Sequence, residues 1–269
     1  MIPLPSTIGS IRSVTCFGVG EGWPSGDRRH ASFLYRCGTT NLLVDCGDGM
    51  SSAFKAAGIA YEEVDAVFLS HMHSDHVGGF SMFVQSLWLQ QRRRPLPVYA
   101  APRAISALKA WLEAVVLPPE LIGFVIDWRP LTAGQPIAIG DVVVTAHATR
   151  HLESLRRSFE ARYPATSFEA FSFVMEGPGF RVAHTADIGD VLDLEPLLQA
   201  RPGLMICELS HVDPKPLCAA LRATPPGHVM FVHVAREHLD VPGEAERWLH
   251  TLLDPVPFAM AHDGQVVPF

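Results

Sequence analysis

A short run of metal-binding residue types is the most informative feature of the sequence. His71-Met72-His73-Ser74-Asp75-His76 places three imidazoles and a carboxylate close together. If the run begins extended, His71 and His73 point to the same side, because side chains alternate along an extended chain. Asp75 and His76 then approach the same space from the first turn of a following helix. Neutral imidazole and carboxylate are ordinary ligands of zinc and similar ions, so this loop can supply ligands to two adjacent metal ions.

The run resembles the signature His-x-His-x-Asp-His of the metallo-β-lactamase superfamily. All four ligating positions match, an apolar strand is expected before the run and a helix after it, and Gly78-Gly79 follows as is usual in the family. Residues 43–49 look like the family's strand that ends in an Asp-x-Gly turn. There Asp45 is expected to be structural or to hold a metal-bound histidine, with Asp48 as the weaker candidate.

The same resemblance implies where the remaining ligands lie. The third histidine should follow a later strand, where His151 is preferred and His147 competes with it. The bridging carboxylate should follow another strand; Asp187 is expected there, with Asp190 as the fallback. An ordinary member has Gly-Asp-Thr or Ser-Asp-Thr at this point, so Ala-Asp-Ile is a departure from the pattern. His233, at the end of the last core strand, is expected to complete the set.

The resemblance therefore implies two divalent metal ions with defined ligand sets. The first ion takes His71, His73 and His151, the second takes Asp75, His76 and His233, and Asp187 bridges both. Zinc is the first expectation, with manganese or iron as alternatives. Two such ions can share a hydroxide and polarise a substrate oxygen, which is hydrolytic chemistry, and Asp75 can orient that hydroxide.

A proton donor for the leaving group is sought in the segment Cys207-Glu208-Leu209-Ser210-His211. A Glu after a strand with a nearby His resembles the ribonuclease Z branch of the superfamily, so His211 is the candidate donor. A buried histidine with only a packing role is the equally weighted alternative. Gly18-Val19-Gly20 before a proline-containing loop is also similar to that branch, whose members mostly cleave phosphodiesters.

One departure from ribonuclease Z concerns the substrate. That enzyme carries a long glycine-rich arm for transfer RNA, whereas here residues 152–186 separate the third histidine from the bridging aspartate and two strands use half of them. Residues 152–169 form at most a short lid, containing Arg156, Arg157 and Arg162. With 21 Lys and Arg against 28 Asp and Glu, the formal charge is −7, which does not favour nucleic acid in general. We therefore expect a small anionic phosphodiester rather than transfer RNA.

Three other functions stay open at this stage. A lactone, ester or other acyl substrate would suit the same nucleophile, and fold alone does not decide between them. An iron-dependent oxidoreductase is disfavoured, because diiron relatives carry Glu at the second position of the motif, where this chain has His73. A binding protein without turnover is disfavoured by the complete ligand set.

The elements that position these residues read as two successive sets of strands and helices, which predicts sheet layers packed face to face with helices outside. The resemblance makes this an α/β fold, a four-layer αβ/βα sandwich of the metallo-β-lactamase type, in a single domain over residues 1–269. Strands are expected at residues 11–17, 32–36, 41–45, 64–70, 98–100, 141–148, 171–176, 180–185, 204–208 and 228–234. Helices are expected at residues 50–57, 77–91, 103–116, 191–200, 216–222 and 244–253.

Composition places the chain among ordinary globular proteins. Hydrophobic residues make up 48% of its 269 residues, which argues against disorder. The five cysteines show no CxxC spacing, so we expect free thiols and a reducing compartment. The first residues lack a basic segment followed by an apolar run, and no stretch is long and apolar enough to cross a membrane. A cytoplasmic protein without a membrane partner is the expectation, and relatives of this branch are often dimers, which leaves a homodimer open.

Overall fold

The computed structural model describes residues 12–241 and 243–269, and it contains two seven-stranded sheets. The first sheet has the order β14-β1-β2-β3-β4-β5-β6 and is parallel from β3 to β6. Its strands are β1 (Arg12–Gly18), β2 (Ser32–Cys37), β3 (Thr40–Val44), β4 (Ala66–Phe68), β5 (Leu96–Ala100), β6 (Ile126–Pro130) and β14 (Val266–Pro268).

The second sheet has the order β13-β12-β11-β10-β9-β8-β7 and is parallel from β10 to β13. Its strands are β7 (Pro136–Ile139), β8 (Val142–Thr149), β9 (Ala170–Gly177), β10 (Phe180–His184), β11 (Leu204–Leu209), β12 (Val229–Val234) and β13 (Phe258–Met260). Each sheet therefore joins an antiparallel half to a parallel half, and the parallel strands end at one edge, where loops with polar side chains can meet.

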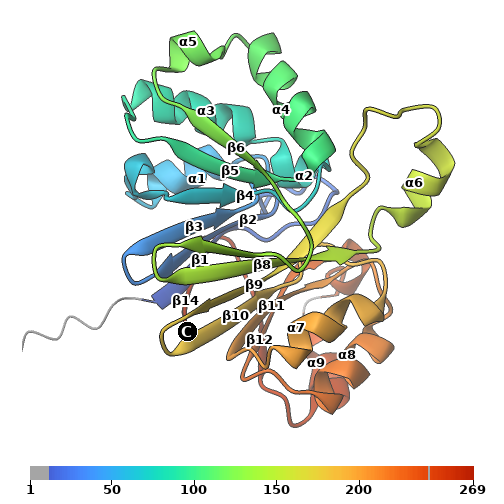
Figure 1. Ribbon diagram of the computed structural model, residues 1–269. Helices are drawn as coiled ribbons and strands as arrows, with labels where there is room; N and C mark the ends of the chain where they lie inside the picture. Colours follow the sequence, from blue (N-terminus) through green and yellow to red (C-terminus); the bar gives the residue numbers. More distant parts are fainter. Residues whose placement is uncertain (1–11, 242) are drawn as a thin grey trace, which may run out of the picture.

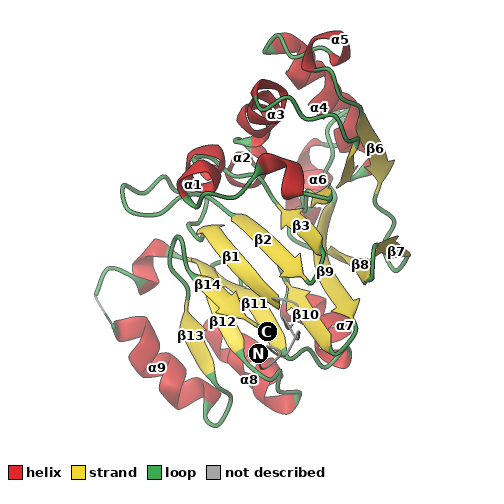
Figure 2. Cartoon of the chain, turned by 90° about the vertical axis from the view of Figure 1, so that its left-hand side faces the viewer, coloured by secondary structure: helices red, strands yellow, loops and turns green. Residues whose placement is uncertain are grey.

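Helices cover the outer face of each sheet (Figures 1 and 2). On the first sheet they are α1 (Met50–Ala56), α2 (Ser74–Val77), α3 (Phe80–Leu89), α4 (Pro102–Ala114) and α5 (Pro119–Ile122), with the 3-10 turn η1 (Tyr61–Glu63). On the second they are α7 (Glu195–Gln199), α8 (Pro214–Ala223) and α9 (Glu244–Leu253), with η2 (Val191–Leu194) and η3 (Arg236–His238). The expected α/β four-layer sandwich of the metallo-β-lactamase type is confirmed.

The burial of the central strands explains why the sheets pack as they do. Every residue of β11 and of β12 is buried, because helices cover one face of the sheet and the first sheet covers the other. Glu208 and His233 lie within these apolar strands, at their carboxyl ends. A polar side chain in such a position needs partners, since burying it unpaired costs free energy. Both residues turn out to belong to the polar cluster described below.

The elements differ from the sequence expectations in four places, the first of which is the unexpected short helix α5. The helix expected over residues 77–91 is divided at Gly78-Gly79 into α2 and α3. Residues 152–169 contain the helix α6 (Glu153–Phe159), which projects from the body of the protein in Figure 1. The short strands β6, β7, β13 and β14 at the sheet edges were not expected, because short strands carry little periodicity. The first expected strand began at Ile11, which lies outside the described residues. The first residues, where no signal sequence was expected, lie outside them too.

All five cysteines are free and buried. Burial raises the pKa of Cys16 and of Cys37 to about 12 and that of Cys218 to about 11, and it raises the pKa values of Cys46 and Cys207 well above the ordinary range. The thiolate is the reactive form, so we expect none of the five thiols to react with a water-soluble disulfide reagent in the native protein. All five should react in denaturant, and a thiol that reacted rapidly without denaturant would contradict this prediction.

The described part of the chain contains no helix long and apolar enough to span a bilayer.

Candidate metal centre

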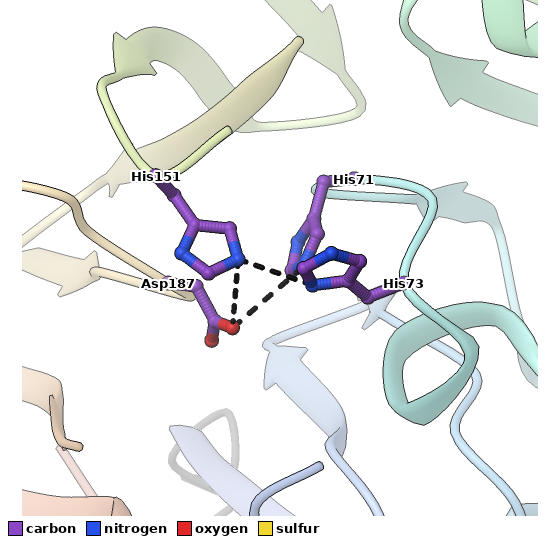
Figure 3. Close-up of side chains that lie close together, drawn as sticks. All are labelled: His71, His73, His151 and Asp187. Carbon is purple, nitrogen blue, oxygen red and sulfur yellow. Dashed lines mark hydrogen bonds and ion pairs between the residues drawn. The ribbon is translucent and has the colours of Figure 1, made fainter. Parts of the chain in front are cut away.

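Four side chains from three separate segments form the first half of the candidate centre (Figure 3). His71 and His73 come from the loop between β4 and α2, His151 follows β8, and Asp187 follows β10. His151 Nε2 lies 3.1 Å from Nδ1 of His73 and 3.5 Å from Oδ2 of Asp187. His71 Nε2 lies 3.6 Å from the same Oδ2. Donor atoms of the four residues all lie within 4.8 Å of one another, a spacing that one cation can share.

Four side chains form the second half, and Asp187 belongs to both halves. The other members are Asp75 and His76 from α2 and His233 from the end of β12. His76 Nε2 lies 3.2 Å from Oδ1 of Asp187 and 3.4 Å from Oδ2 of Asp75. His233 Nε2 lies 3.1 Å from the Asp75 carboxylate and 3.6 Å from Oδ1 of Asp187. Asp187 thus presents one oxygen to each half, the arrangement expected of a bridging ligand.

The nitrogen and oxygen atoms that face the centre are arranged to bind cations rather than to form hydrogen bonds with one another. Nε2 of His71 is buried without a hydrogen-bond partner among the described residues, and Nε2 of His76 and Oδ1 of Asp187 approach to 3.2 Å without the alignment of a hydrogen bond. Such groups are rare in proteins and need an explanation, for which a bound ion is one standard answer. Burial lowers the pKa of His71 well below its ordinary value and that of His151 to about 3, so both imidazoles are neutral and able to ligate. The residues present therefore fit two divalent ions.

Asp45 holds two of these histidines from behind. It accepts hydrogen bonds from the backbone N–H of Ser70 at 2.7 Å and from the Ser70 hydroxyl at 2.8 Å, and it contacts Nδ1 of His76 at 2.7 Å. The same hydroxyl lies 3.0 Å from Nδ1 of His71. With Nδ1 of each ring engaged in this way, Nε2 of His71 and of His76 faces the centre. This is a role that sequence reasoning considered for Asp45, and such contacts fix both the tautomer and the orientation of ligating imidazoles.

Glu208 holds His211 beside the centre. Its buried carboxylate accepts the backbone N–H groups of Ile188, Ser210 and His211, and Nδ1 of His211 lies 3.0 Å from Oε2. The His211 ring stands between His151 and His233, with ring centroids 4.5 and 5.3 Å away. Burial opposes a charge on this imidazole, but the Glu208 hydrogen bond and charge raise the pKa of His211 to about 9.

Asp193 was missed by sequence reasoning, although it ties the His151 loop to the Asp187 loop. It accepts hydrogen bonds from the backbone N–H groups of Arg150 and Gly189, at 2.9 and 3.0 Å, and it pairs with the Arg150 guanidinium at 2.8 Å. The two loops touch so closely that a Cβ on Gly189 would lie 2.4 Å from the Arg150 carbonyl carbon. A glycine is therefore needed here, and an aspartate one turn beyond Gly189 was the only available sequence signal.

Three backbone positions around the centre have left-handed dihedral angles without being glycine. They are Asp45, Ala186 and His233, with φ values of 60, 45 and 47°. Each costs free energy relative to an extended backbone, and such residues cluster at functional sites. All three lie at a strand end, where the turn aims the side chain, or that of the next residue, toward the cluster.

The other histidines lie outside the two groups. His147 is within β8, pairs in register with Ser172, and belongs to no group of metal-capable side chains in the described residues. His184 is buried against Phe33, and its Nδ1 lies 2.7 Å from the Tyr35 hydroxyl, which marks it as a packed strand residue.

The segment expected to form a lid lies beside His151. A cavity of about 480 Å³ opens there, and its lining includes Arg150, Glu153 and Arg156. Arg157 pairs with Glu153 on the outside of α6, so this guanidinium does not face the cavity as a free cation. The cavity is therefore of mixed charge rather than strongly basic.

Replacing each of the two competing histidines by alanine tests which of them is the third histidine ligand. His151→Ala is expected to lower the metal content by one ion, because His151 contacts both His73 and Asp187. His147→Ala is the matched control from the same strand end and should keep the full metal content. Metal bound to each purified variant is counted by plasma mass spectrometry, and loss of an ion from the His147 variant alone would reverse the assignment.

Removal of metal is expected to leave the fold in place. The two sheets and their helices bury an extensive core away from the centre, so secondary structure does not depend on the ligating loops. A chelator should abolish catalysis while the far-ultraviolet circular dichroism spectrum changes little. A collapse of that spectrum on chelation would instead show that the metal is structural.

Comparison with known proteins agrees with the fold and the motif. Residues 40–234 match the family model described as the beta-lactamase superfamily domain. The chain is 30% identical over 154 residues to a ribonuclease Z of Bradyrhizobium sp. (strain ORS 278), covering 55% of this chain and 49% of that protein. It is 35% identical over 134 residues to a ribonuclease Z of Methanopyrus kandleri, covering 50% and 44%.

This chain thus spans about half the length of those curated relatives. Among solved structures, the metallo-beta-lactamase fold protein YhfI from Bacillus subtilis superposes with a TM-score of 0.75 at 19% identity, covering 97% of this chain and 100% of that one. The family model spans well over half of the sequence and includes the whole histidine and aspartate run. The chain therefore belongs to the metallo-β-lactamase superfamily.

Proposed function

We propose that this protein is a metal-dependent hydrolase that cleaves a small, anionic phosphodiester. The observation that carries the proposal is the convergence of six imidazole and carboxylate side chains around the Asp187 carboxylate, with His211 held at their edge by Glu208. Ribonuclease Z, the name of the curated relatives, describes cleavage of a phosphodiester backbone, and this supports the choice of phosphorus over an acyl carbon. Because the centre takes residues from both sheets, we also propose that the chain works as one domain.

The proposed ligand sets are those that the sequence resemblance implied. His71, His73 and His151 would hold one ion, Asp75, His76 and His233 would hold the other, and Asp187 would bridge them. When bound, two divalent ions supply Lewis-acid activation of water and charge neutralisation at the phosphate. Zinc is our first choice of metal, because imidazole and carboxylate donors suit it.

The side chains then divide the remaining work. Asp75 accepts a hydrogen bond from the attacking water and so aims it at phosphorus, and the proton that the water loses passes to the solvent. A new bond forms between the water oxygen and phosphorus, and the bond to the leaving ester oxygen breaks. His211, with Nδ1 bound to Glu208, keeps Nε2 free to give a proton to that leaving oxygen. Glu208 positions the imidazole and holds the proton on Nδ1, as a buried carboxylate does for many general-acid histidines.

The test is hydrolysis of bis(4-nitrophenyl) phosphate by protein loaded with zinc or with manganese. The rate is measured from the absorbance of the nitrophenolate that is released. Turnover that disappears with excess chelator supports the proposal. A lactone and a precursor transfer RNA are assayed in parallel, because an acyl substrate and the substrate of the relatives are the two competitors. Absence of turnover on every phosphodiester, with two metals bound and the lactone hydrolysed, would replace this proposal by acyl hydrolysis.

The choice of a small substrate over transfer RNA rests on the segment between His151 and Asp187. In the structure this segment holds one helix of seven residues, α6, and the strands β9 and β10. The three arginines expected to form a basic lid are partly neutralised, since Glu153 pairs with Arg157 and lies 4.0 Å from Arg156. Combined with a formal charge of −7, this arrangement offers little long-range attraction for a polyanion.

A further inference from the structure

A surface loop beside the metal centre, residues 20–28, carries an exposed tryptophan that the proposed mechanism does not use. Both ends of this loop are fixed. The Gly20 N–H donates to the Arg29 carbonyl at 2.7 Å, and the Asp263 carboxylate accepts the N–H groups of Val19 and Arg29 at 3.0 and 2.7 Å. A loop clamped at both ends holds its tip over a defined part of the surface. We call residues 20–28 the Trp loop.

The Trp loop lies against the second half of the centre. The His233 N–H donates to the Val19 carbonyl at 2.8 Å, which ties the base of the loop to a proposed ligand. Further along the loop, a Cβ on Gly22 would stand 3.5 Å from Oδ2 of Asp75. Trp23 follows at the next position, and neighbouring Cα atoms are about 3.8 Å apart. The indole therefore belongs to the residue next to one that contacts the centre.

Arg236 stacks on this indole. Its guanidinium carbon lies 4.5 Å from the centroid of the Trp23 ring, a cation–π distance. Arg236 is three residues beyond His233, so its backbone also lies close to the centre. In the described parts of the chain, no carboxylate lies within ion-pair distance of its guanidinium. Its charge is available to an anion.

The surroundings of the pair are open rather than packed. Trp23 is 62% exposed, although tryptophan side chains are highly buried on average, and Arg236 is exposed as well. A cavity of about 310 Å³ adjoins them, lined by the Trp loop together with Val234 and Leu239. With one face against the guanidinium, the indole still presents a large flat surface to a second planar group.

A second cation–π pair, Arg12 with Phe180, has a structural role and so contrasts with the Trp23 and Arg236 pair. Arg12 lies over the Phe180 ring at 5.4 Å, at the ends of β1 and β10 farthest along the strands from Asp187. There the ring packs on Phe269 and the guanidinium donates to the Gly179 carbonyl at 3.1 Å, so both partners are used inside the fold. Among the residues that the structure describes, the Trp23 ring packs on no other aromatic ring and the Arg236 guanidinium makes no hydrogen bond or ion pair.

We propose that Trp23 and Arg236 bind the organic group of the substrate, and that this group carries a flat aromatic ring such as a nucleobase. The ring stacks on the indole while the guanidinium contacts the phosphate. Stacking on aromatic side chains and a bidentate contact from arginine are the common means of holding a nucleotide. The substrate class is then a phosphodiester of a nucleoside or a similar aryl alcohol, and this assignment rests on the proposed function.

Binding of product-like monoesters to the zinc-loaded protein tests the proposal by titration calorimetry. The probes are adenosine monophosphate, which has a ring, and ribose phosphate, which has none. Trp23→Leu should weaken binding of adenosine monophosphate by about 10-fold and change ribose phosphate by less than about twofold. Trp23→Phe should restore most of the difference, since it restores a ring. Arg236→Gln should weaken both probes, and the matched control Arg12→Gln should weaken neither.

Turnover of an adenosine-bearing and a methyl-bearing nitrophenyl phosphodiester separates this proposal from the proposed function. Trp23→Leu should raise KM for the first substrate alone. Equal effects on both probes, or no effect on either, would overturn the role of the Trp loop even if phosphodiesters are hydrolysed. If no phosphodiester is hydrolysed while the calorimetric pattern holds, the proposed function fails and the ring-binding site stands.

Discussion

Replacing Asp187 by Asn is expected to lower hydrolysis of bis(4-nitrophenyl) phosphate by about 10³-fold or more. Among the described residues, Asp187 alone belongs to both four-residue groups, and it presents one oxygen to each. A bridging carboxylate is a shared source of negative charge, and two ions held close together repel each other without it. Loss of several kcal/mol of metal-based stabilisation of the transition state corresponds to at least this factor.

The matched control for this prediction is Asp190→Asn. Asp190 was the alternative bridging residue in the sequence, but in the structure its carboxylate caps η2 by accepting the Leu192 N–H at 2.8 Å. Asn also caps helices well, so stability should hardly change. The Asp190 variant should keep both metals and near-normal turnover. If the Asp190 variant instead lost a metal and the Asp187 variant did not, the bridge would be assigned to the wrong residue.

His211→Ala is expected to lower kcat by about 10²- to 10⁴-fold without removing metal, which is the usual contribution of a general acid. The loss should grow as the leaving group becomes a poorer one, because nitrophenolate departs almost unaided whereas an alkoxide needs the proton. His211 stands beside the centre, with Nδ1 3.8 Å from Oδ2 of Asp187, and Glu208 holds its ring. Its position fits a donor rather than a packing residue.

Two measurements together decide this second prediction. Rates are compared for a series of aryl and alkyl esters of methyl phosphate, and bound metal is counted for the same preparations. His147→Ala serves as the control, since that histidine belongs to neither group. A drop of equal size for all leaving groups would argue against proton donation. A drop accompanied by lost metal would place His211 among the ligands, as its grouping with Glu208 and His233 also allows.

Local pattern was enough to predict the loop from His71 to His76 and the strand that precedes it. The reason is that these ligands sit in one turn, so their spacing in the sequence is nearly their spacing in space. The later ligands were harder to choose. His147 and His151 share one strand end, and the sequence alone ranked them without deciding. In the structure His147 is still inside β8, whereas His151 lies past its end, 3.1 Å from His73 and 3.5 Å from Asp187, which is why we propose His151.

Side chains whose partners are distant in the sequence were predicted least well. Asp193 has no motif of its own. It matters because it joins the Arg150 and Gly189 loops, which are far apart in the sequence and meet only in the folded sheet. Trp23 and Arg236 are more than 200 positions apart, and no periodicity links them. Only the packing of the Trp loop against the end of β12 creates that pair.

The sequence by itself determined which chemistry is available: a metal-binding run after a buried strand, apolar strands that must be covered on both faces, and cysteines without a pairing pattern. Those properties are local, because residue type and near spacing dictate them. The tertiary structure alone decided which distant side chains share the centre, which of them face it, and what stands beside it. Long-range contacts depend on how whole sheets pack, and that packing is a sum over many weak apolar contacts rather than a property of any one segment.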